Sequence, residues 1–484
     1  MNSMQAALEK NCKPEDLTEL LRVQKGDFIE EGSASYEVRV DRLDRCIKLL
    51  VENVDAICVA VEKDFGCRSP RVTKMSEIAT SLTSLRHAKK HLKTWMKPEK
   101  RKSLFPLNLL GARSQVYYQA KGVVGLMTPW NMPVSMIFSP LTDIIAAGNR
   151  CMIKPSEFTP AVSHLMADLF SDYFDFSEVA ICPGEVEVAM AFSQLPFDHL
   201  IFTGASSVGK KVMLAAAQNL TPVTLELGGK SPVIVSDNYE ITKAAESIIT
   251  AKMLNAGQVC ISPDYVYVPE GKVDQFISVC KSTFTEQYPT VIDNPDYVSI
   301  INERNAQRLQ RYLDDAKSSG CEVVELSSSE LDASDICGVR IPPNLVMNPS
   351  DNCLVMQEEI FGPILIIKSY TKINDCVDYI NDRPRPLALY LFSDDKSEQE
   401  YVLTHTTSGG AAINDIAVQF ACDDMPFGGV GDSGMGNYHG REGFKTFSHS
   451  KAVYRGSKIN LAKLFGSLPP YGDKVDKMLD GQLK

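Results

Sequence analysis

The stretch Gly122–Thr142, which reads GVVGLMTPWNMPVSMIFSPLT, decides the fold of this chain. It contains no charged residue, and it is long enough to cross a membrane as a helix. Three prolines interrupt it, however, and each proline removes a helical hydrogen bond and clashes with the preceding turn. We therefore expect a buried strand over Val123–Met127, a rigid loop, and a helix that begins near residue 135.

Short apolar runs alternate with segments of helical periodicity after this stretch. The alternation is typical of a parallel sheet covered by helices on both faces, so the sequence predicts an α/β fold. Ligands of such sheets bind beyond the carboxyl ends of the strands. We expect strands at 123–127, 151–154, 179–182, 200–203 and 223–227, then, in a second series, at 264–268, 322–325, 363–368, 387–393 and 411–414. The expected helices lie near 135–147, 160–174, 185–194 and 208–219, then near 239–254, 272–285, 303–318, 372–381 and 396–405.

The two ends of the chain follow other patterns. Apolar residues at helical spacing predict one long helix over 35–65 and a second over 75–96. A basic, exposed link is expected over Lys97–Lys102, followed by an edge strand over Gln115–Gln119. Beyond Asn414 the chain is rich in glycine and has no long periodic run, so we expect loops and a terminal arm there.

Length, charge and cysteine usage limit the possible classes of protein. The 484 residues exceed one ordinary core, so we expect two or three domains, with a boundary near Gly228–Gly229. The formal net charge of −11 argues against nucleic-acid or anionic-membrane binding. The 13 cysteines form no Cys-x-x-Cys pair, and His-Glu-x-x-His is absent from the sequence, so we expect reduced thiols and no metal. Met1–Pro14 has no secretory pattern, which predicts a cytoplasmic protein without a membrane anchor.

A glycine turn follows one of the predicted strands. The run Leu200–Lys210 reads as strand, turn and helix, with Gly204 and Gly209 as its glycines. Glycine lets a backbone approach a phosphate, and a helix N-terminus attracts negative charge. Glycines also serve turn geometry alone, and the pattern does not decide between the two interpretations.

Charged residues lie at the carboxyl ends of two other predicted strands. Lys154 and Glu157 would reach ribose hydroxyls there, although a solvated strand end with Ser156 as a helix cap is a simpler interpretation. Glu226 lies between two leucines. A carboxylate among apolar groups has a raised pKa and can act as a general base near neutrality, but ordinary alternation would turn Glu226 outward.

An asparagine and a cysteine complete the candidates for chemistry. Asn131 lies between two prolines and beside Trp130, so its amide is held where it can stabilise a developing oxyanion, unless backbone groups of a buried loop satisfy it. Cys260 lies in the small polar run 255–262. A loop cysteine is open to a ligand, whereas most cysteines are small buried hydrophobes.

In identity and order, these motifs resemble the aldehyde dehydrogenase superfamily over roughly residues 40–455. The resemblance is closest to the shorter class 3 branch, and in particular to bacterial coniferyl aldehyde dehydrogenases. The family motifs are Pro129-Trp130-Asn131, Lys154-Pro155-Ser156-Glu157, Phe202-Thr203-Gly204 with Gly209, Glu226-Leu227-Gly228-Gly229-Lys230-Ser231-Pro232, Gly257-Gln258-x-Cys260, Glu359-Ile360-Phe361-Gly362-Pro363 and Pro426-Phe427-Gly428-Gly429. The branch markers are Asn255 to Tyr265 and Gly434 to Gly440, and the runs Lys63 to Ser69 and Leu195 to His199 point to the coniferyl enzymes.

The resemblance implies an aldehyde dehydrogenase fold with three parts. These are a Rossmann-like NAD(P)-binding domain over 1–228, an α/β catalytic domain over 229–425, and C-terminal loops with a small β oligomerisation arm over 426–484, to which 110–121 contributes. It also implies NAD as the cofactor, with NADP possible, an aldehyde as the substrate, and a homodimer.

The resemblance further implies roles for individual residues. Cys260 would be the nucleophile, Asn131 and the Cys260 backbone N–H the oxyanion hole, and Glu226 the base. Where many family members have serine or asparagine after Phe-Thr-Gly, this chain has Ala205, so Ser206 or backbone N–H groups must hold the pyrophosphate. The expected cofactor contacts are Trp130, Lys154, Glu157, Gly204, Ser206, Gly209, Glu359 and Phe361, and the expected substrate contacts are Met132, Tyr118 and Phe427.

The expected reaction is oxidation of an aldehyde to the carboxylic acid through a Cys260 thiohemiacetal and thioester. Apolar pocket candidates favour an aromatic aldehyde, such as coniferyl aldehyde, or a medium or long aliphatic one. A CoA-acylating relative is the first alternative, although such enzymes typically lack the Glu226 equivalent. A non-catalytic structural or binding protein on the same fold is the second. We also expect Cys260 to be the thiol most readily alkylated near neutral pH.

Overall fold

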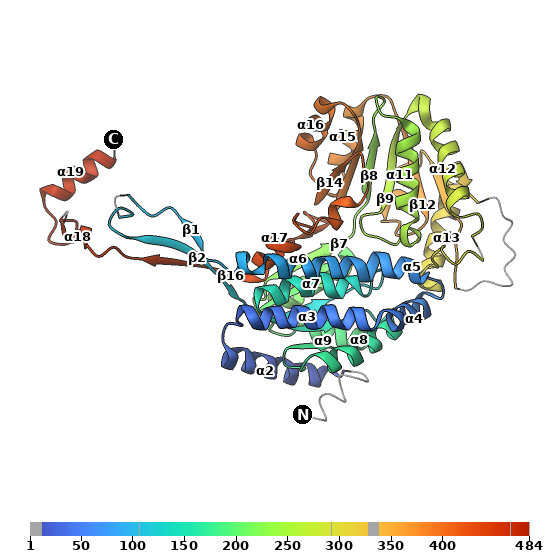
Figure 1. Ribbon diagram of the computed structural model, residues 1–484. Coiled ribbons are helices and arrows are strands. Elements are labelled where there is room, and N and C mark those ends of the chain that lie inside the picture. The colour runs from blue at the N-terminus through green and yellow to red at the C-terminus, as the bar shows by residue number, and fades with distance from the viewer. Residues whose placement is uncertain (1–11, 106, 292, 328–337, 465, 484) are drawn as a thin grey trace.

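A computed structural model describes residues 12–105, 107–291, 293–327, 338–464 and 466–483, which form three β-sheets and their helices (Figure 1). The sheets have six, seven and three strands. The two larger sheets and their helices form the body, and the three-stranded sheet projects away from it. Helix α19 (Asp473–Gln482) lies at the far end of this projection (Figure 1). The α/β fold expected from the sequence is confirmed.

The six-stranded sheet begins with the stretch that decides the fold. Its order is β15-β7-β6-β3-β4-β5, and neighbours are parallel except for β15, which runs antiparallel to β7. All residues of β3 and β4 are buried, because structure covers both faces. Its elements match the predicted ones closely, apart from β15. They are β3 (Val123–Met127), α7 (Ser135–Ala147), β4 (Arg150–Lys154), α8 (Pro160–Tyr173), β5 (Val179–Ile181), α9 (Val186–Ser193), β6 (His199–Gly204), α10 (Ser206–Ala217), β7 (Val223–Leu227) and β15 (Gly434–Met435).

A topological switch point lies between β3 and β6. The chain passes from β3 to β4 on one side and returns to β6 on the other, so the loops after β3 and β6 diverge. In open α/β sheets the crevice at such a point, beyond the carboxyl ends of the strands, is where ligands bind. Thr128–Asn131 follows β3 and Ala205–Ser206 follows β6, so the fold directs both predicted motifs toward this crevice.

The seven-stranded sheet contains two strands that the sequence analysis missed. Close to the expected domain boundary at Gly228–Gly229, β8 (Ser231–Val235) is a buried strand, with a register irregularity between Ser231 and Pro232. The other, β11 (Asn344–Met347), has only four residues. The strand order of the seven-stranded sheet is β10-β11-β12-β9-β8-β13-β14. The other elements of this part are α11 (Ile241–Met253), β9 (Pro263–Pro269), α12 (Val273–Gln287), α13 (Glu303–Ser318), β10 (Val323–Glu325), α14 (Leu354–Gln357), β12 (Ile364–Tyr370), α15 (Ile373–Asn381), β13 (Ala388–Phe392), α16 (Lys396–His405) and β14 (Gly410–Ile413).

The N-terminal helices differ from the predicted ones. An additional helix, α2, spans Pro14–Glu31, and the expected helix over 35–65 is divided by Asn53, whose φ of −117° and ψ of 20° are not helical. The helix expected over 75–96 begins as a π-helical turn before α6. The spacing of apolar residues continues across these breaks. The sequence analysis therefore did not predict them, because apolar spacing does not indicate a local change in backbone dihedral angles. The segments are α3 (Tyr36–Glu52), α4 (Val54–Phe65), α5 (Pro70–Thr73), the π-helix Lys74–Ala79 and α6 (Thr80–Trp95).

The three-stranded sheet forms the arm and consists of β1 (Glu99–Arg101), β2 (Arg113–Ala120) and β16 (Ser448–Arg455). The prediction of an edge strand was wrong, since β2 lies between β1 and β16 and pairs with both. The expected exposed link contains β1. The segment after Asn414 is also more regular than expected, because it supplies β15, α17 (Gly440–Thr446) and β16.

The body is held together by two hydrophobic clusters. The larger one runs continuously from the helices and β3 and β4 of the six-stranded sheet into the seven-stranded sheet, and the smaller packs α2 and α9 against the opposite face of the six-stranded sheet. Over the described ranges, no helix is long and apolar enough to cross a membrane. The same residues include no cluster of three or more His, Cys, Asp or Glu side chains that would hold a metal ion.

Candidate active site

The loop between α11 and β9 holds Cys260 in a constrained backbone. Asn255, Ala256 and Gly257 all adopt left-handed φ values, of 53°, 52° and 74°. For residues other than glycine, such conformations cost roughly 1–3 kcal/mol each and persist only where surrounding contacts enforce them. Only glycine fits at position 257, because a Cβ would collide with the carbonyl of Gly362. The loop is therefore pressed against the segment that contains Gly362.

Amide hydrogen bonds join the Cys260 loop to Asn131. The Nδ2 of Asn131 donates to the carbonyl oxygen of Gln258 at 3.0 Å, and the Nδ2 of Asn255 donates to the carbonyl oxygen of Asn131 at 3.0 Å. All three side chains are buried. A carboxamide has two N–H donors, so the bond to Gln258 fixes the Asn131 amide while its second N–H stays available for a ligand oxygen. Both sequence interpretations of Asn131 therefore describe part of what it does.

Cys260 is half-buried and lies close to two carboxyl groups. Burial, followed by the nearby carboxyls of Glu359 and Glu226, raises the pKa of the Cys260 thiol to about 12, against a smaller opposing effect of backbone N–H groups. The structure thus brings together three residues that lie far apart in the sequence. The raised pKa favours the neutral thiol at neutral pH, and the expectation that Cys260 is the thiol most readily alkylated there stays a prediction. Among the described residues, Cys422 is the one exposed cysteine.

Glu226 is buried at the end of β7. Neither carboxyl oxygen has a hydrogen-bond partner among the described residues, and burial raises the pKa of Glu226 well above its usual value, with the Gly429 backbone N–H opposing in part. The alternative in which Glu226 points outward was wrong, because β15 pairs beside it at Gly434. A buried carboxyl without a partner can exchange a proton with a neighbouring thiol or water once it ionises.

Trp130 and Phe361 form an aromatic pair. Their ring centroids lie 5.3 Å apart with an interplanar angle of 77°, an edge-to-face arrangement. Phe361 has a left-handed φ of 47°, and the guanidinium of Arg308 donates to the preceding carbonyl of Ile360 at 2.8 Å. The sequence pattern alone placed these two rings on unrelated loops, and the fold brings them into contact.

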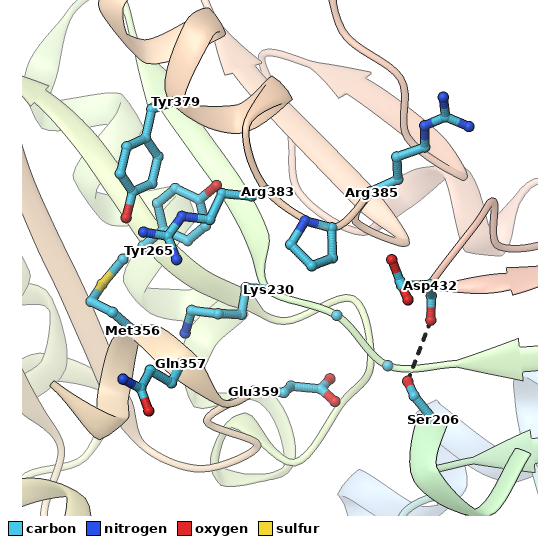
Figure 2. Close-up of a pocket in the computed structure, with 13 residues that line it drawn as sticks. Ser206, Lys230, Tyr265, Met356, Gln357, Glu359, Tyr379, Arg383, Arg385 and Asp432 are labelled. Atoms are coloured by element: carbon cyan, nitrogen blue, oxygen red, sulfur yellow. Dashed lines mark hydrogen bonds between the residues drawn. The ribbon is translucent and has the colours of Figure 1, made fainter. Parts of the chain in front are cut away.

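Glu359 faces a pocket of about 250 Å³ (Figure 2). Burial, and then the charge of Asp264, raises the pKa of Glu359 to about 8, against opposing effects of the Gly229 backbone N–H and of Lys230 and Arg308. In Figure 2 the Glu359 carboxyl lies on the side of the pocket that Ser206 lines. Residues from both larger sheets therefore meet at this pocket.

Lys154 and Glu157 lie together beyond the end of β4. The Lys154 side chain is buried, its Nζ donates to the carbonyl oxygen of Pro155 at 2.6 Å, and it lies 3.9 Å from the carboxylate of the more exposed Glu157. Burial lowers the pKa of Lys154, and Glu157 opposes this. The simpler interpretation was wrong in two respects: Lys154 is not solvated, and the cap of α8 is Thr159 rather than Ser156.

The glycine turn after β6 serves two purposes. At Gly209 a Cβ would approach Leu227 Cδ2 to 2.6 Å, so this glycine allows α10 to pack closely on β7. At Gly204 a Cβ would press on the ring of Phe202. Ala205 is the N-cap of α10 and offers no side-chain cap, while the Ser206 hydroxyl donates to the Asp432 carbonyl oxygen at 3.4 Å. The first N–H groups of α10 are therefore left for another acceptor.

These groups fit a bound dinucleotide. An uncapped helix N-terminus beyond a parallel strand attracts phosphate, and a lysine and a carboxylate beyond the neighbouring strand match ribose hydroxyls. The donors, the acceptors and the switch point of the sheet are all consistent with such a ligand.

The three expected substrate contacts lie in different places. Met132 is buried, and its Sδ accepts from Arg68 at 3.0 Å. Phe427 packs against Tyr438, whose own pKa is raised well above its usual value by burial and by the nearby Glu226 and Cys260, so Phe427 is one ring away from the site. The Tyr118 hydroxyl donates to Glu99 in β1 and its ring meets Phe444, so Tyr118 belongs to the base of the arm.

Sequence reasoning missed several residues that support the site. Tyr438, Asn255 and Gln258 were predicted only as positions within family motifs. In the structure, Tyr438 lies close to Glu226 and Cys260, and Asn255 and Gln258 form hydrogen bonds with Asn131. The Tyr390 hydroxyl donates to the carbonyl oxygen of Ile261 at 2.7 Å and was not singled out at all. In the sequence, these residues are marked only by being polar within apolar or glycine-rich runs. Such a position cannot be assigned a role until the residues that pack against it are known.

A half-buried thiol, a buried carboxyl and a fixed amide beside a dinucleotide-type crevice are the features of an α/β enzyme of the dehydrogenase class. A family model described as "Aldehyde dehydrogenase family" matches residues 7–453. The chain belongs to the aldehyde dehydrogenase family and is an aldehyde dehydrogenase.

Individual members of the family are similar to this chain over nearly its full length. The chain is 48% identical over 469 residues to a "Probable coniferyl aldehyde dehydrogenase" of Caulobacter vibrioides, covering 97% of both chains. It is 47% identical to the "Coniferyl aldehyde dehydrogenase" of a Pseudomonas species, covering 96% of both. A solved structure, "Substrate bound state of Staphylococcus Aureus AldH", superposes with a TM-score of 0.89 at 36% identity and covers 96% of this chain and 99% of that one.

Proposed function

We propose that this chain oxidises an aldehyde to the carboxylic acid with NAD(P) as the oxidant, through a covalent intermediate on Cys260. The observation that carries the proposal is the joining of three groups in one buried site: the Cys260 thiol, the Asn131 amide fixed to its loop, and the buried Glu226 carboxyl. Membership of the aldehyde dehydrogenase family supports it.

The first step is addition of the Cys260 sulfur to the carbonyl carbon of the aldehyde. The carbonyl oxygen gains negative charge, which the free N–H of Asn131 and the backbone N–H of Cys260 stabilise. The thiol proton passes to Glu226 when that carboxyl is ionised. Because burial raises the pKa of both groups, the singly ionised pair that reacts becomes more abundant as the pH rises.

The second half of the reaction releases the acid. When bound, the dinucleotide supplies the acceptor for the hydride lost from the thiohemiacetal carbon, which leaves a thioester on Cys260. Glu226 first releases the thiol proton to solvent and then takes a proton from water; the water oxygen attacks the thioester carbon, and the carbon–sulfur bond breaks. The proton returns to the sulfur, so the thiol is restored and the carboxylic acid leaves.

NAD is the proposed cofactor, with NADP possible. The carboxylate of Glu157 lies where a ribose 2′-hydroxyl would bind, and like charge would repel a 2′-phosphate there. The six-stranded sheet supports assigning cofactor binding to 1–228, and the seven-stranded sheet supports assigning catalysis to 229–425. The segment 426–484 would complete the arm, although its β15 joins the six-stranded sheet.

The proposed substrate is an aromatic aldehyde such as coniferyl aldehyde, or a medium or long aliphatic aldehyde. The names of two relatives that are 47% and 48% identical support the aromatic choice. Phe427, Tyr438 and Phe420 form a group of rings, with Phe427 and Phe420 centroids 4.9 Å apart, that would receive a flat apolar substrate.

We also propose a cytoplasmic homodimer assembled through the arm. Among the described residues, β16 pairs with β2 on one side only, which leaves its other edge open for pairing with a second chain. Phe105 is 80% exposed and Tyr454 53% exposed on this projection, which suits burial against a second chain.

The test is a Cys260→Ala variant assayed with a panel of aldehydes at saturating NAD. NAD(P)H formation should disappear, while the matched variant Cys422→Ala keeps its rate because that thiol is exposed and lies outside the site. Product analysis in the presence of CoA should find free acid. Retained turnover in Cys260→Ala would exclude the covalent route, and acyl-CoA without acid would favour the CoA-acylating alternative.

A further inference from the structure

A fully buried ion pair lies beneath the loop that carries Asn131. Arg68 and Glu77 are both 0% exposed, and Arg68 Nη1 lies 2.9 Å from Glu77 Oε1. Neither residue is assigned a role in the proposed function, on which this inference rests. We propose that Arg68 and Glu77 are positioning residues that clamp the loop 131–135 and so hold the Asn131 amide in place for the oxyanion.

Arg68 holds the first end of this loop. Its Nη1 donates to the carbonyl oxygen of Asn131 at 3.2 Å, and its Nη2 donates to Met132 Sδ at 3.0 Å and to the Ser76 hydroxyl at 3.2 Å. The Asn131 carbonyl thus accepts from a guanidinium on one element and from Asn255 on the Cys260 loop. The two donors fix the orientation of the Asn131 backbone carbonyl. The Asn131 side-chain amide, which is attached to the same residue, therefore keeps its direction.

Glu77 holds the second end. Its Oε2 accepts from the backbone N–H of Val134 at 2.6 Å and of Ser135 at 3.1 Å. Val134 is the N-cap of α7 and offers no side chain for capping, so a carboxylate from a different helix fills that position. Negative charge at a helix N-terminus is favourable, and the helix start becomes a fixed point for the loop before it.

The backbone around Glu77 is shaped for this contact. Glu77 lies in the π-helical turn Lys74–Ala79, between α5 and α6. Single π-helical turns inside α-helices are frequent at functional sites, because the inserted residue redirects the side chains around it. A regular helix would place Glu77 at a different angle to α7.

Stability alone does not account for a pair of this kind. Replacing a buried ion pair with apolar side chains of similar volume is often neutral or stabilising, since the desolvation cost can exceed the attraction. The four hydrogen bonds from this pair to the loop 131–135 instead define the position of one backbone segment. A displacement of about 1 Å at a catalytic group can cost about a hundredfold in rate, so fixing this segment matters for catalysis.

The test is a double-mutant cycle between Arg68→Lys and Asn131→Ala in the full-length enzyme. Lysine keeps the charge beside Glu77 but loses the planar fork that reaches Asn131 and Met132 together. In the parent enzyme Arg68→Lys should lower kcat about tenfold to a hundredfold with the KM for NAD changed less than about threefold. In the Asn131→Ala background the same substitution should cost less than about twofold, because the group it positions is absent.

Lys74→Gln is the matched control, since Lys74 lies on the same π-helical turn but forms an exposed pair with Asp55; its rate should be unchanged. Rates are normalised to thiol titrated at Cys260. If Arg68→Lys folds poorly, Ser76→Ala removes only the hydroxyl that holds Nη2, and the inference requires a severalfold fall in kcat that vanishes in the Asn131→Ala background.

Three results overturn the inference. An equal loss from Arg68→Lys in both backgrounds, or no loss in the parent, removes the positioning role while the proposed function stands. Undiminished activity in Asn131→Ala alone removes the proposed oxyanion role and the inference together.

Discussion

The Cys260 site and the projecting arm are built on opposite principles. In the site, polar side chains are buried and tied to backbone groups from several elements, as at Asn131, Gln258 and Asn255. In the arm, short antiparallel strands pair with one another, and large apolar side chains such as Phe105 remain exposed. The site is closed by contacts within the chain, whereas the described residues of the arm leave an open strand edge and exposed apolar surface.

This difference leads us to expect that the Cys260 site governs the reaction and that the arm governs assembly. A buried polar network is satisfied only in one arrangement, because each unpaired group would cost its desolvation energy. An exposed strand edge has no such restriction and is stabilised by whatever pairs with it. Changes in the site should therefore alter rate and pH dependence with assembly unchanged, and changes in the arm should do the reverse.

The largest expected effect comes from Glu226→Gln. Glutamine cannot accept the proton from thiol or water, so kcat should fall about 10²–10⁴-fold, the usual contribution of a general base. Steady-state kinetics with a sedimentation control measures this. Dimer content should not change, and a variant that keeps its rate would remove Glu226 from the mechanism.

The pH dependence of stability offers a second measure of the same residue. Burial raises the pKa of Glu226 above its unfolded value, so the folded state binds the proton more tightly and its contribution to stability is full below pH about 4.5. That contribution is lost as the pH rises through the raised pKa. The melting temperature of the parent should thus fall relative to Glu226→Gln as the pH rises above about 4.5, and parallel curves would contradict the shift.

The Cys260 thiol should show a large pH effect on alkylation. Because its pKa is raised to about 12, the thiolate fraction should grow about tenfold for each pH unit between 7 and 9, about a hundredfold in all. Rates of iodoacetamide labelling, followed by peptide mass spectrometry, measure this, with exposed Cys422 as the internal comparison. A pH-independent rate at Cys260 would show that the free enzyme holds a thiolate.

Proline substitutions in β16 test the arm. Of the neighbours Ala452 and Val453, one directs its N–H toward β2 and the other toward the open edge, because strand residues alternate. The substitution at the open edge should weaken the dimer at least tenfold in sedimentation velocity while activity per chain falls less than about tenfold. If neither variant changes the sedimentation, the arm does not assemble the protein.

The smallest expected effect is on cofactor choice. Removing the charge in Glu157→Gln should raise the ratio of kcat/KM for NADP over NAD by about fivefold to tenfold, since a partly exposed charge is screened. The ratio is measured at low and at moderate salt. An unchanged ratio would show that Glu157 does not face the 2′ position.

Most strands and helices of the two larger sheets were predictable from the sequence. The centres of strands β3 to β7 are apolar, and segments of helical periodicity separate the strands, so their composition indicates burial on both faces of the sheet. Local interruptions were not predictable: Asn53 divides one helix, and β8 begins at a proline-containing turn with an irregular register. These depend on dihedral angles and on strand pairing with distant partners.

The candidate site divides in the same way. By itself, the sequence determined the family, through motifs around Cys260, Glu226 and Asn131, because those residue types at those places are required by one chemistry. Only the tertiary structure decided that the Cys260 thiol lies beside Glu226 and Glu359 with a raised pKa, that Tyr118 belongs to the arm, and that Arg68 and Glu77 lie beneath Asn131. The physical reason is that desolvation and hydrogen bonding depend on which groups surround a side chain, and distant parts of the chain supply those groups.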